Sequence, residues 1–172
     1  MTPVPRNERP AVCGPCGGEC CRTRPGVEAP GRFLGAPDPA AALAAALGSG
    51  DWVLAEHVGV PWAEGQPPPP EERSRILRYP RPATLAERGT GAPAPGGEPS
   101  PCVFLGPAGC RLAFEDRPRM CQALLPSPAG ECEASWDRRS AALAWLPWQG
   151  LVAEALQRAC AARNSAARSS AK

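Results

Sequence analysis

The sequence predicts a small, irregular α+β domain that is stabilised by metal. Three observations point to this fold class. Pro and Gly together make up about a quarter of the 172 residues, whereas Leu, Ile, Val and Phe make up only about 15%, less than an ordinary apolar core requires. The chain also contains nine cysteines. A net charge of +2 does not give the self-repulsion of a disordered chain, so the cysteines are the obvious source of the missing cohesion.

We expect four parts: an N-terminal cysteine knot, a Pro-rich loop, a short β-hairpin and a C-terminal helix. The domain spans residues 11–163, between a flexible arm at residues 1–10 and a frayed tail at residues 164–172. Residues 61–100 hold ten Pro and five Gly, which predicts a loop with one short extended piece at residues 76–79. No run approaches the roughly 18 apolar residues of a membrane span, and no apolar secretory segment is visible, so cytoplasmic localisation is the default expectation.

The first half of the domain begins with the knot, where residues 11–22 are dense in Cys and Gly and follow no regular period. A helix is predicted next, because Asp38 can cap it, Pro39 suits its first turn, and Leu43 and Leu47 lie four residues apart. Gly48 marks its end. Residues 51–60 then predict a half-buried strand, since apolar side chains alternate at Trp52, Leu54, Val58 and Val60.

The second half begins with a predicted hairpin. Residues 102–105 form a short apolar run, residues 106–109 supply turn chemistry, and residues 110–114 return beside the run. Asp137 can cap a helix that carries Leu143 and Leu146, and Pro147 kinks or restarts it. The apolar face continues through Leu151, Val152, Ala155, Leu156 and Ala159. Cys160 follows Leu156 by one turn and is predicted to be a buried thiol.

The aromatic side chains are predicted to supply the bulk of a small core. They include Trp52, Trp62, Trp136, Trp145 and Trp148. We expect the knot to fold back on residues 102–132, with the C-terminal helix packed over both segments. Metal binding would offset the chain entropy of closing so long a loop.

Eight of the nine cysteines form two groups of four, with 80 residues between the groups. The first group is Cys13, Cys16, Cys20 and Cys21, and the second is Cys102, Cys110, Cys121 and Cys132. A tight turn at residues 14–15 brings the first two sulfurs to one side, where they can share an ion. All eight are candidate ligands of zinc or iron, including an iron–sulfur cluster, because thiolates suit both metals.

Three other interpretations compete with metal binding. If the cysteines were only small buried apolar residues, chance would not place four of the nine within nine residues of sequence. A disulfide framework is disfavoured by the odd count, the absence of a visible signal segment and the strained ring that Cys20 and Cys21 would close. Residues 13–16 have the Cys-Gly-Pro-Cys sequence of thioredoxins, but the flanking strand and helix that thiol redox catalysis needs are not predicted.

Both ends of the domain carry a longer pattern. It consists of Cys-x2-Cys-x3-Cys-Cys, then Cys102-Val-Phe-Leu-Gly-Pro-Ala-Gly-Cys110, Phe114-Glu-Asp-Arg117-Pro118 and Cys121, with Cys132 downstream. This pattern resembles the zinc- or iron-chelating CxxCxxCC family, the YkgJ-like cysteine-cluster proteins. Gln122 stands where the family usually has Arg. The resemblance implies a small cytoplasmic domain that binds zinc or iron, with no activity shared by the whole family.

Metal binding of unknown specific activity is therefore the predicted function, with a metal ion as the expected partner. Two alternatives stay open: an iron–sulfur enzyme or accessory subunit in electron transfer or protein modification, and a zinc-structured adaptor that binds another protein. The 18 Arg and one Lys are interspersed with 17 acidic residues and form no basic stripe for nucleic acid. No catalytic residue is predicted, because the neighbouring Glu115 and Asp116 point apart.

Two further kinds of residue are candidates for the site. His57, the only His, is expected on a strand surface rather than in a metal site. Arginines near the cysteines are candidates to compensate the negative charge of the thiolates. They are Arg22, Arg24, Arg111, Arg117 and Arg119.

Overall fold

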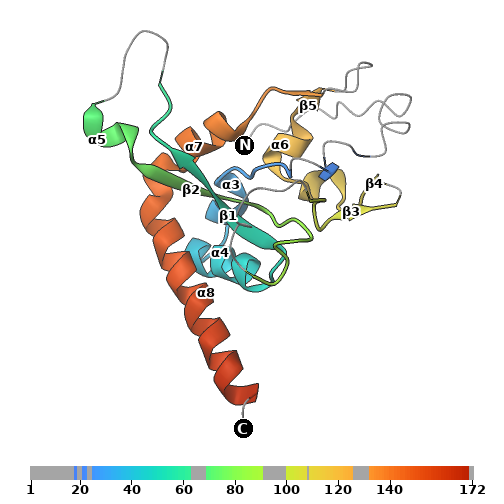
Figure 1. Cartoon of the computed structure of the whole chain (residues 1–172), viewed down its shortest axis with the longest axis vertical. Helices are drawn as coiled ribbons and strands as arrows, with labels where there is room; N and C mark the ends of the chain where they lie inside the picture. Colours follow the sequence, from blue (N-terminus) through green and yellow to red (C-terminus); the bar gives the residue numbers. More distant parts are fainter. Residues whose placement is uncertain are drawn as a thin grey trace.

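A computed structural model describes residues 18, 21–22, 25–62, 69–90, 100–107, 109–125 and 132–170 of the chain. Figure 1 shows a mixed domain in which helices surround a central hairpin and a long helix forms the C-terminal end. The α+β class predicted from the sequence is confirmed. The described strands form three separate antiparallel sheets of two strands each.

The central hairpin joins β1 (Trp52–Val58) to β2 (Ile76–Pro82), with Trp52 opposite Pro82 and Val58 opposite Ile76. The strand predicted at residues 51–60 is confirmed. Its predicted alternation is wrong, because residues 52–54 are all buried whereas Val58 is 69% exposed. One end of β1 is covered on both faces, since Val53 packs with Ala83 and Val103 while its neighbours enter the main core.

The segment predicted to be mostly loop contains more regular structure than expected. A short helix, α5 (Pro70–Arg73), precedes β2, and β2 is longer than the extended piece predicted at residues 76–79. β2 tolerates Pro80 and Pro82 because it belongs to a sheet of only two strands, where few ladder hydrogen bonds are demanded of it. Because of its Pro content, residues 80–82 of β2, one of the two strands of the central hairpin, were predicted as a loop.

The predicted Ala-rich helix is confirmed as α4 (Pro39–Gly48), which follows the short α3 (Gly31–Leu34). Asp38 Oδ1 accepts a hydrogen bond from Ala41 N at 2.9 Å, so this side chain satisfies one of the N–H groups that a helix start leaves unpaired. Leu43 and Leu47 are buried against the core, as their spacing predicts.

The C-terminal region consists of α7 (Arg138–Trp145), the 3₁₀ turn η2 (Leu146–Trp148) and α8 (Gln149–Ser170). Asp137 caps α7 by accepting from Ser140 N at 2.8 Å, and the helix restarts around Pro147 as predicted. Leu143 is exposed rather than buried, because α7 turns Ala141, Ala142 and Trp145 to the core.

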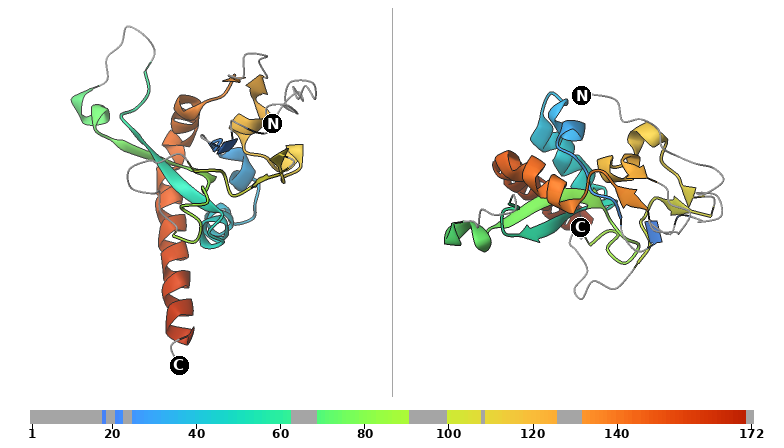
Figure 2. Two further views of the ribbon diagram at one scale, coloured as in Figure 1. Left: turned by 45° about the vertical axis from the view of Figure 1, so that its right-hand side comes forward. Right: turned by 90° about the horizontal axis from the view of Figure 1, so that it is seen from above.

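α8 departs from the expectations for the end of the chain. It continues to Ser170, where a frayed tail was expected from residue 164, and Figures 1 and 2 show its last turns standing clear of the body. The predicted burial of Cys160 is wrong. Its neighbour Ala159 faces the core, whereas Cys160 is exposed and its Sγ accepts from Arg163 Nη2 at 3.4 Å.

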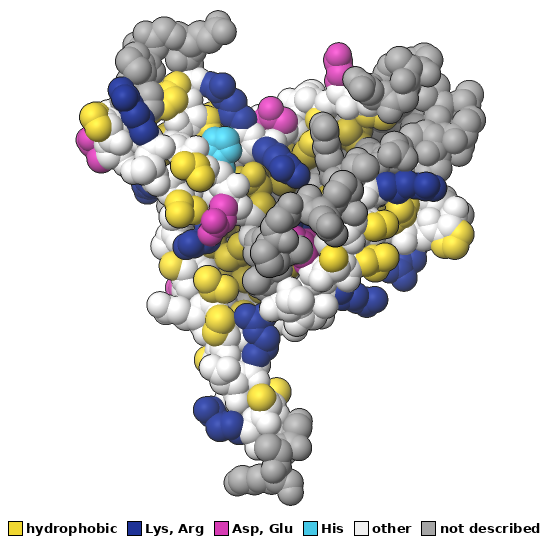
Figure 3. Space-filling view, viewed as in Figure 1, with side chains coloured by type: hydrophobic (Ala, Val, Ile, Leu, Met, Phe, Trp, Pro, Cys, Tyr) yellow, Lys and Arg dark blue, Asp and Glu magenta, His cyan; other side chains and the backbone are white. Residues whose placement is uncertain are grey.

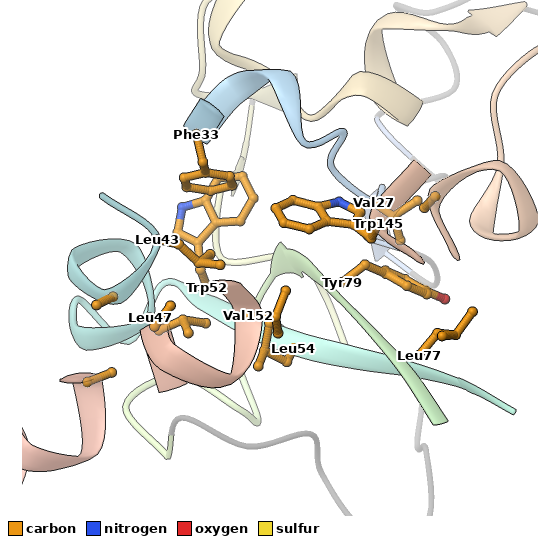
Figure 4. Packing of buried hydrophobic residues seen from close by; sticks show 14 of the residues in the cluster. Val27, Phe33, Leu43, Leu47, Trp52, Leu54, Leu77, Tyr79, Trp145 and Val152 are labelled. Atoms are coloured by element: carbon orange, nitrogen blue, oxygen red, sulfur yellow. The ribbon is translucent and has the colours of Figure 1, made fainter. Parts of the chain in front are cut away.

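The main core gathers around three aromatic rings (Figure 4). Phe33 lies 6.2 Å, centroid to centroid, from both Trp52 and Trp145. Trp145 is fully buried and lies beside Val27 in the view of Figure 4. The prediction that tryptophans supply core volume is confirmed for Trp52 and Trp145, whereas Trp148 is 39% exposed.

Among the elements that the structure describes, α8 packs mainly against α4 and also against β2, whereas it was expected to pack over the cysteine-bearing segments. At its start, Gln149 accepts from Arg78 N and donates to Arg78 O, both at 2.9 Å, so its amide occupies the edge of β2 as a neighbouring strand would. Among the helices of the described residues, none has both the length and the apolar character needed to cross a membrane.

Candidate metal centre

Six of the nine cysteines lie in the described residues: Cys21, Cys102, Cys110, Cys121, Cys132 and Cys160. The predicted ligands Cys13, Cys16 and Cys20 lie outside them, as does the turn expected at residues 14–15. The geometry of the first cysteine group is therefore described only at Cys21.

The two cysteine groups meet at Cys21 and Cys102. The backbone N–H of Cys102 donates to the carbonyl oxygen of Cys21 at 2.7 Å. This direct contact closes the long loop between the groups, as the fold-back of the knot onto the second group requires.

Cys102 is held from the other side by the residues that follow β2. Thr84 forms an isolated antiparallel bridge with Cys102, and Val103 N donates to Ala83 O at 3.0 Å. Phe104 then packs against both apolar clusters, so its ring ties the next hairpin to the core. Cys102 itself is buried.

A buried ion pair fixes the turn that carries Thr84. The guanidinium of Arg81 donates to both carboxylate oxygens of Glu87, at 2.8 and 2.6 Å. Thr84 donates to the same carboxylate through its backbone N–H at 2.9 Å and its hydroxyl at 3.0 Å. Such a two-pronged pair is geometrically specific, so it holds the chain opposite Cys102 in one conformation.

Cys110 lies on the predicted hairpin, which is confirmed in a shorter form. β3 (Leu105–Gly106) pairs with β4 (Gly109–Cys110), and Leu105 is opposite Cys110. Gly109 has φ +103°, a conformation that side-chain-bearing residues rarely adopt. The thiol of Cys110 is half-buried and forms no disulfide.

Cys121 lies on the short helix α6 (Arg119–Gln122), which follows the 3₁₀ turn η1 (Phe114–Asp116). Its Sγ packs directly over the Cα of Gly26, only five residues after Cys21. A Cβ at position 26 would overlap this sulfur and would lie 3.2 Å from the backbone N of Cys121. The segment that leaves the first cysteine group therefore runs against both Cys102 and Cys121.

Gly26→Ala is expected to lower the free energy of unfolding by about 1–3 kcal/mol, because the new methyl group must displace the Cys121 sulfur or the backbone beside it. Urea denaturation measures the loss. Gly150→Ala is the matched control, since nothing lies within 4 Å of a Cβ there and a helical Ala is favourable. Equal stability of the Gly26 variant and the wild type would contradict the close packing.

Cys132 is not brought to Cys121. It precedes β6 (Glu133–Ala134), which pairs with β5 (Leu124–Leu125) so that Leu125 is opposite Glu133. This register places Cys132 at the loop end of the hairpin, whereas Cys121 precedes the other end. Within the described ranges, no three His, Cys, Asp or Glu side chains are grouped closely enough to hold a metal ion.

Gln122 and Arg117 shape the turn before Cys121. The Gln122 amide donates to the carbonyls of residues 114, 115 and 117, at 3.0–3.2 Å, so one side chain joins three backbone groups of the turn. Arg117 donates to Leu112 O at 3.3 Å, and its guanidinium lies over the Phe114 ring. Arg111 likewise donates to Val103 O. These contacts fix the chain between Cys102 and Cys121.

In the described residues, the other polar candidates, His57, Glu115 and Asp116, belong to no group of three possible metal ligands. His57 is half-buried on β1, opposite Leu77, where a strand-surface side chain was expected. Glu115 and Asp116 are exposed in η1. Arg32 Nη2 donates to the backbone oxygen of Asp116 at 2.8 Å, which ties η1 to α3.

Sequence reasoning missed Glu28, a buried carboxylate beside the second cysteine group. Burial raises the pKa of Glu28 to about 6, although the Arg32 guanidinium and two backbone N–H donors act in the opposite direction. Arg32 Nη1 lies 3.3 Å from Oε2, but that oxygen accepts no hydrogen bond within the described residues. Ala29 and Arg32 are local partners, but the contact with Arg119 N joins residues 91 positions apart, so no local pattern signals it.

The raised pKa predicts a pH-dependent stability. Since Glu28 binds its proton more tightly in the folded chain, its contribution is complete below about pH 4.5 and is lost as the pH rises through about 6. The free energy of unfolding of the wild type, relative to Glu28→Gln, should fall by about 2 kcal/mol across this range in urea titrations. Asp38 and Asp137 have lowered pKa values, so their contributions are lost only at lower pH. A difference that does not change with pH would contradict this assignment.

Comparison with known proteins adds no relative: no family model, curated protein or solved structure matches the chain. The assignment of the site therefore depends on its cysteines and on the contacts that bring their two groups together.

Proposed function

We propose that this chain is a metal-binding protein that holds zinc or iron, the iron either alone or in an iron–sulfur cluster, through its two cysteine groups. The ligands are drawn from Cys13, Cys16, Cys20 and Cys21 and from Cys102, Cys110, Cys121 and Cys132. One observation carries the proposal. The chain leaving the first group is hydrogen-bonded to Cys102 and packed against the sulfur of Cys121.

The donor set fits a thiophilic metal. Thiolates bind zinc and iron strongly, and the Cys110 and Cys132 thiols form no disulfide that would compete with a metal. The Cys121 sulfur lies over a glycine, and the absence of a Cβ there lets the chain that follows Cys21 approach it closely. Among the described residues, Cys21 and Cys102 are the members of the two groups in direct contact, and Cys121 lies against Gly26, five residues after Cys21.

The metal would supply cross-linking and, if it is an iron–sulfur cluster, electron transfer. The chain's own part is to hold the thiols in place and to limit solvent. Arg81, Glu87 and Thr84 fix the backbone opposite Cys102. In a reducing cytoplasm, which we propose as the compartment, these thiols would remain available as ligands.

The experiment that tests the proposal is elemental analysis of protein purified without oxygen, with a visible spectrum of the same sample. A brown protein with several irons per chain indicates an iron–sulfur cluster, and a colourless one with bound zinc indicates a structural site. Protein that holds no more metal than a variant lacking all eight cysteines, both as purified and after incubation with zinc or with iron and sulfide, would refute the proposal.

Cys160→Ser is the control for nonspecific binding by thiols. Cys160 lies exposed on α8, outside both groups, so its removal should leave the metal content unchanged.

A further inference from the structure

The buried carboxylate of Glu28 lies at the contact between the core and the helix that carries Cys121. Glu28 is only 4% exposed. Burying a charged group is costly unless its partners compensate, and an apolar side chain would fill the same volume without that cost. The partners of Glu28 therefore indicate what this residue does.

Three consecutive residues meet three residues of α6 in antiparallel order. Gly26 faces Cys121, Val27 O accepts from Met120 N at 3.1 Å, and Glu28 Oε1 accepts from Arg119 N at 3.1 Å. Cys121, which faces Gly26, and Arg119, which binds Glu28, lie within a single turn of α6. A shift of Glu28 relative to Arg119 would thus move the Cys121 sulfur relative to Gly26.

The side chain of Glu28 does what a local cap does in other helices. α6 begins after Pro118, which makes no side-chain capping hydrogen bond. Arg119 N is one of the donors that every helix start leaves without an intrahelical acceptor. Glu28 Oε1 accepts from it across 91 residues of sequence, and also from Ala29 N at 2.8 Å.

Glu28 is itself fixed to the core through its backbone. Its N–H donates to Pro80 O of β2 at 3.0 Å, and its carbonyl accepts from the indole Nε1 of Trp145 at 2.8 Å. Arg32 completes the surroundings, since it pairs with the carboxylate and lies over the Trp52 ring. The carboxylate is therefore a rigid link from the core to α6.

We propose that Glu28 is the positioning residue of the metal site, a long-range cap that fixes α6 so that Cys121 presents its sulfur to the metal. The proposal rests on the function proposed above. It assigns to Glu28 an effect on the metal that acts through Arg119, with no contact between the carboxylate and the metal.

The test compares Glu28→Ala with Glu28→Gln, whose amide oxygen can still accept from Arg119 N. Zinc affinity is measured by competition with a chromophoric chelator. Glu28→Ala should bind zinc about 10–100-fold more weakly than the wild type, which is the usual effect of removing a group that orients a metal ligand. Glu28→Gln should retain most of the wild-type zinc affinity. Leu43→Ala, a cavity in α4, is the control for general destabilisation and should leave the affinity within a few-fold of the wild type.

A second measurement is independent of metal affinity. Amide hydrogen exchange over residues 119–122 should quicken in Glu28→Ala but stay near the wild-type rate in Glu28→Gln and in Leu43→Ala. Equal losses in all three variants, or unchanged exchange and affinity in Glu28→Ala, would overturn the positioning role. A wild type that binds no zinc refutes the proposed function instead, and the exchange rates still decide whether Glu28 fixes α6.

Discussion

Replacing Cys20 or Cys121 by serine is expected to remove the metal and the cooperative thermal transition together. A structural thiolate site contributes about 10–16 kcal/mol to folding, whereas whole domains are stable by only about 5–15 kcal/mol. Loss of the site would therefore leave the folded state without a net advantage. The expectation is stronger here than in a Leu-rich domain, because Leu, Ile, Val and Phe make up only about 15% of the chain.

The measurement is metal content together with a circular dichroism melting curve for each variant. Cys160→Ser should match the wild type in both, since its thiol is exposed on α8. Unchanged metal content and melting in the Cys121 variant would exclude this cysteine as a ligand and would move the site toward the other cysteines.

Trp145→Ala is expected to lower the free energy of unfolding by about 3–5 kcal/mol, the usual cost of truncating a fully buried aromatic side chain. The ring lies between Phe33 and Val27 (Figure 4). Its N–H donates to the Glu28 carbonyl. Trp145→Phe keeps most of the volume and removes only that donor, so about 1–3 kcal/mol is expected.

Urea denaturation distinguishes these two contributions. Trp148→Ala is the matched control three residues further on, and because Trp148 is 39% exposed it should cost less than Trp145→Ala, about 1–2 kcal/mol. A Trp145→Ala variant as stable as Trp148→Ala would show that the core does not depend on this ring.

Local signals in the sequence predicted the elements whose stability is local. Asp38 and Asp137 each cap the helix that their position indicates, because a capping hydrogen bond joins residues only three apart. The hairpin of β3 and β4 was predictable for the same reason, since Gly109 supplies the conformation that its turn needs.

The parts that were missed depend on partners far away in the sequence. β2 pairs with β1 despite Pro80 and Pro82, and Pro content alone indicates a loop. Leu143 is exposed because α7 turns Ala141, Ala142 and Trp145 toward the core, and Cys160 is exposed because α8 turns Val152, Ala155 and Ala159 toward it. Glu28 shows no local sign of burial, because it caps a helix whose first N–H, that of Arg119, lies 91 residues away in the sequence.

The space-filling view shows where the molecule leaves room for attachment. The last turns of α8 project from the body, and their side chains are small or charged (Figure 3). An affinity tag at this end of α8 is therefore expected to lie away from the described core.

The antiparallel meeting of residues 26–28 with residues 119–121 also constrains the order of events during synthesis. A ribosome adds about 5–20 residues per second, so roughly 5–20 seconds separate the appearance of Gly26 from that of Cys121. For most of that interval the first cysteine group lacks its counterpart, because Cys102 follows Gly26 by 76 residues and Cys121 follows it by 95. If the cysteines bind metal as proposed, the first group must therefore stay reduced, and without its partner ligands, until the second half of the chain has been synthesised.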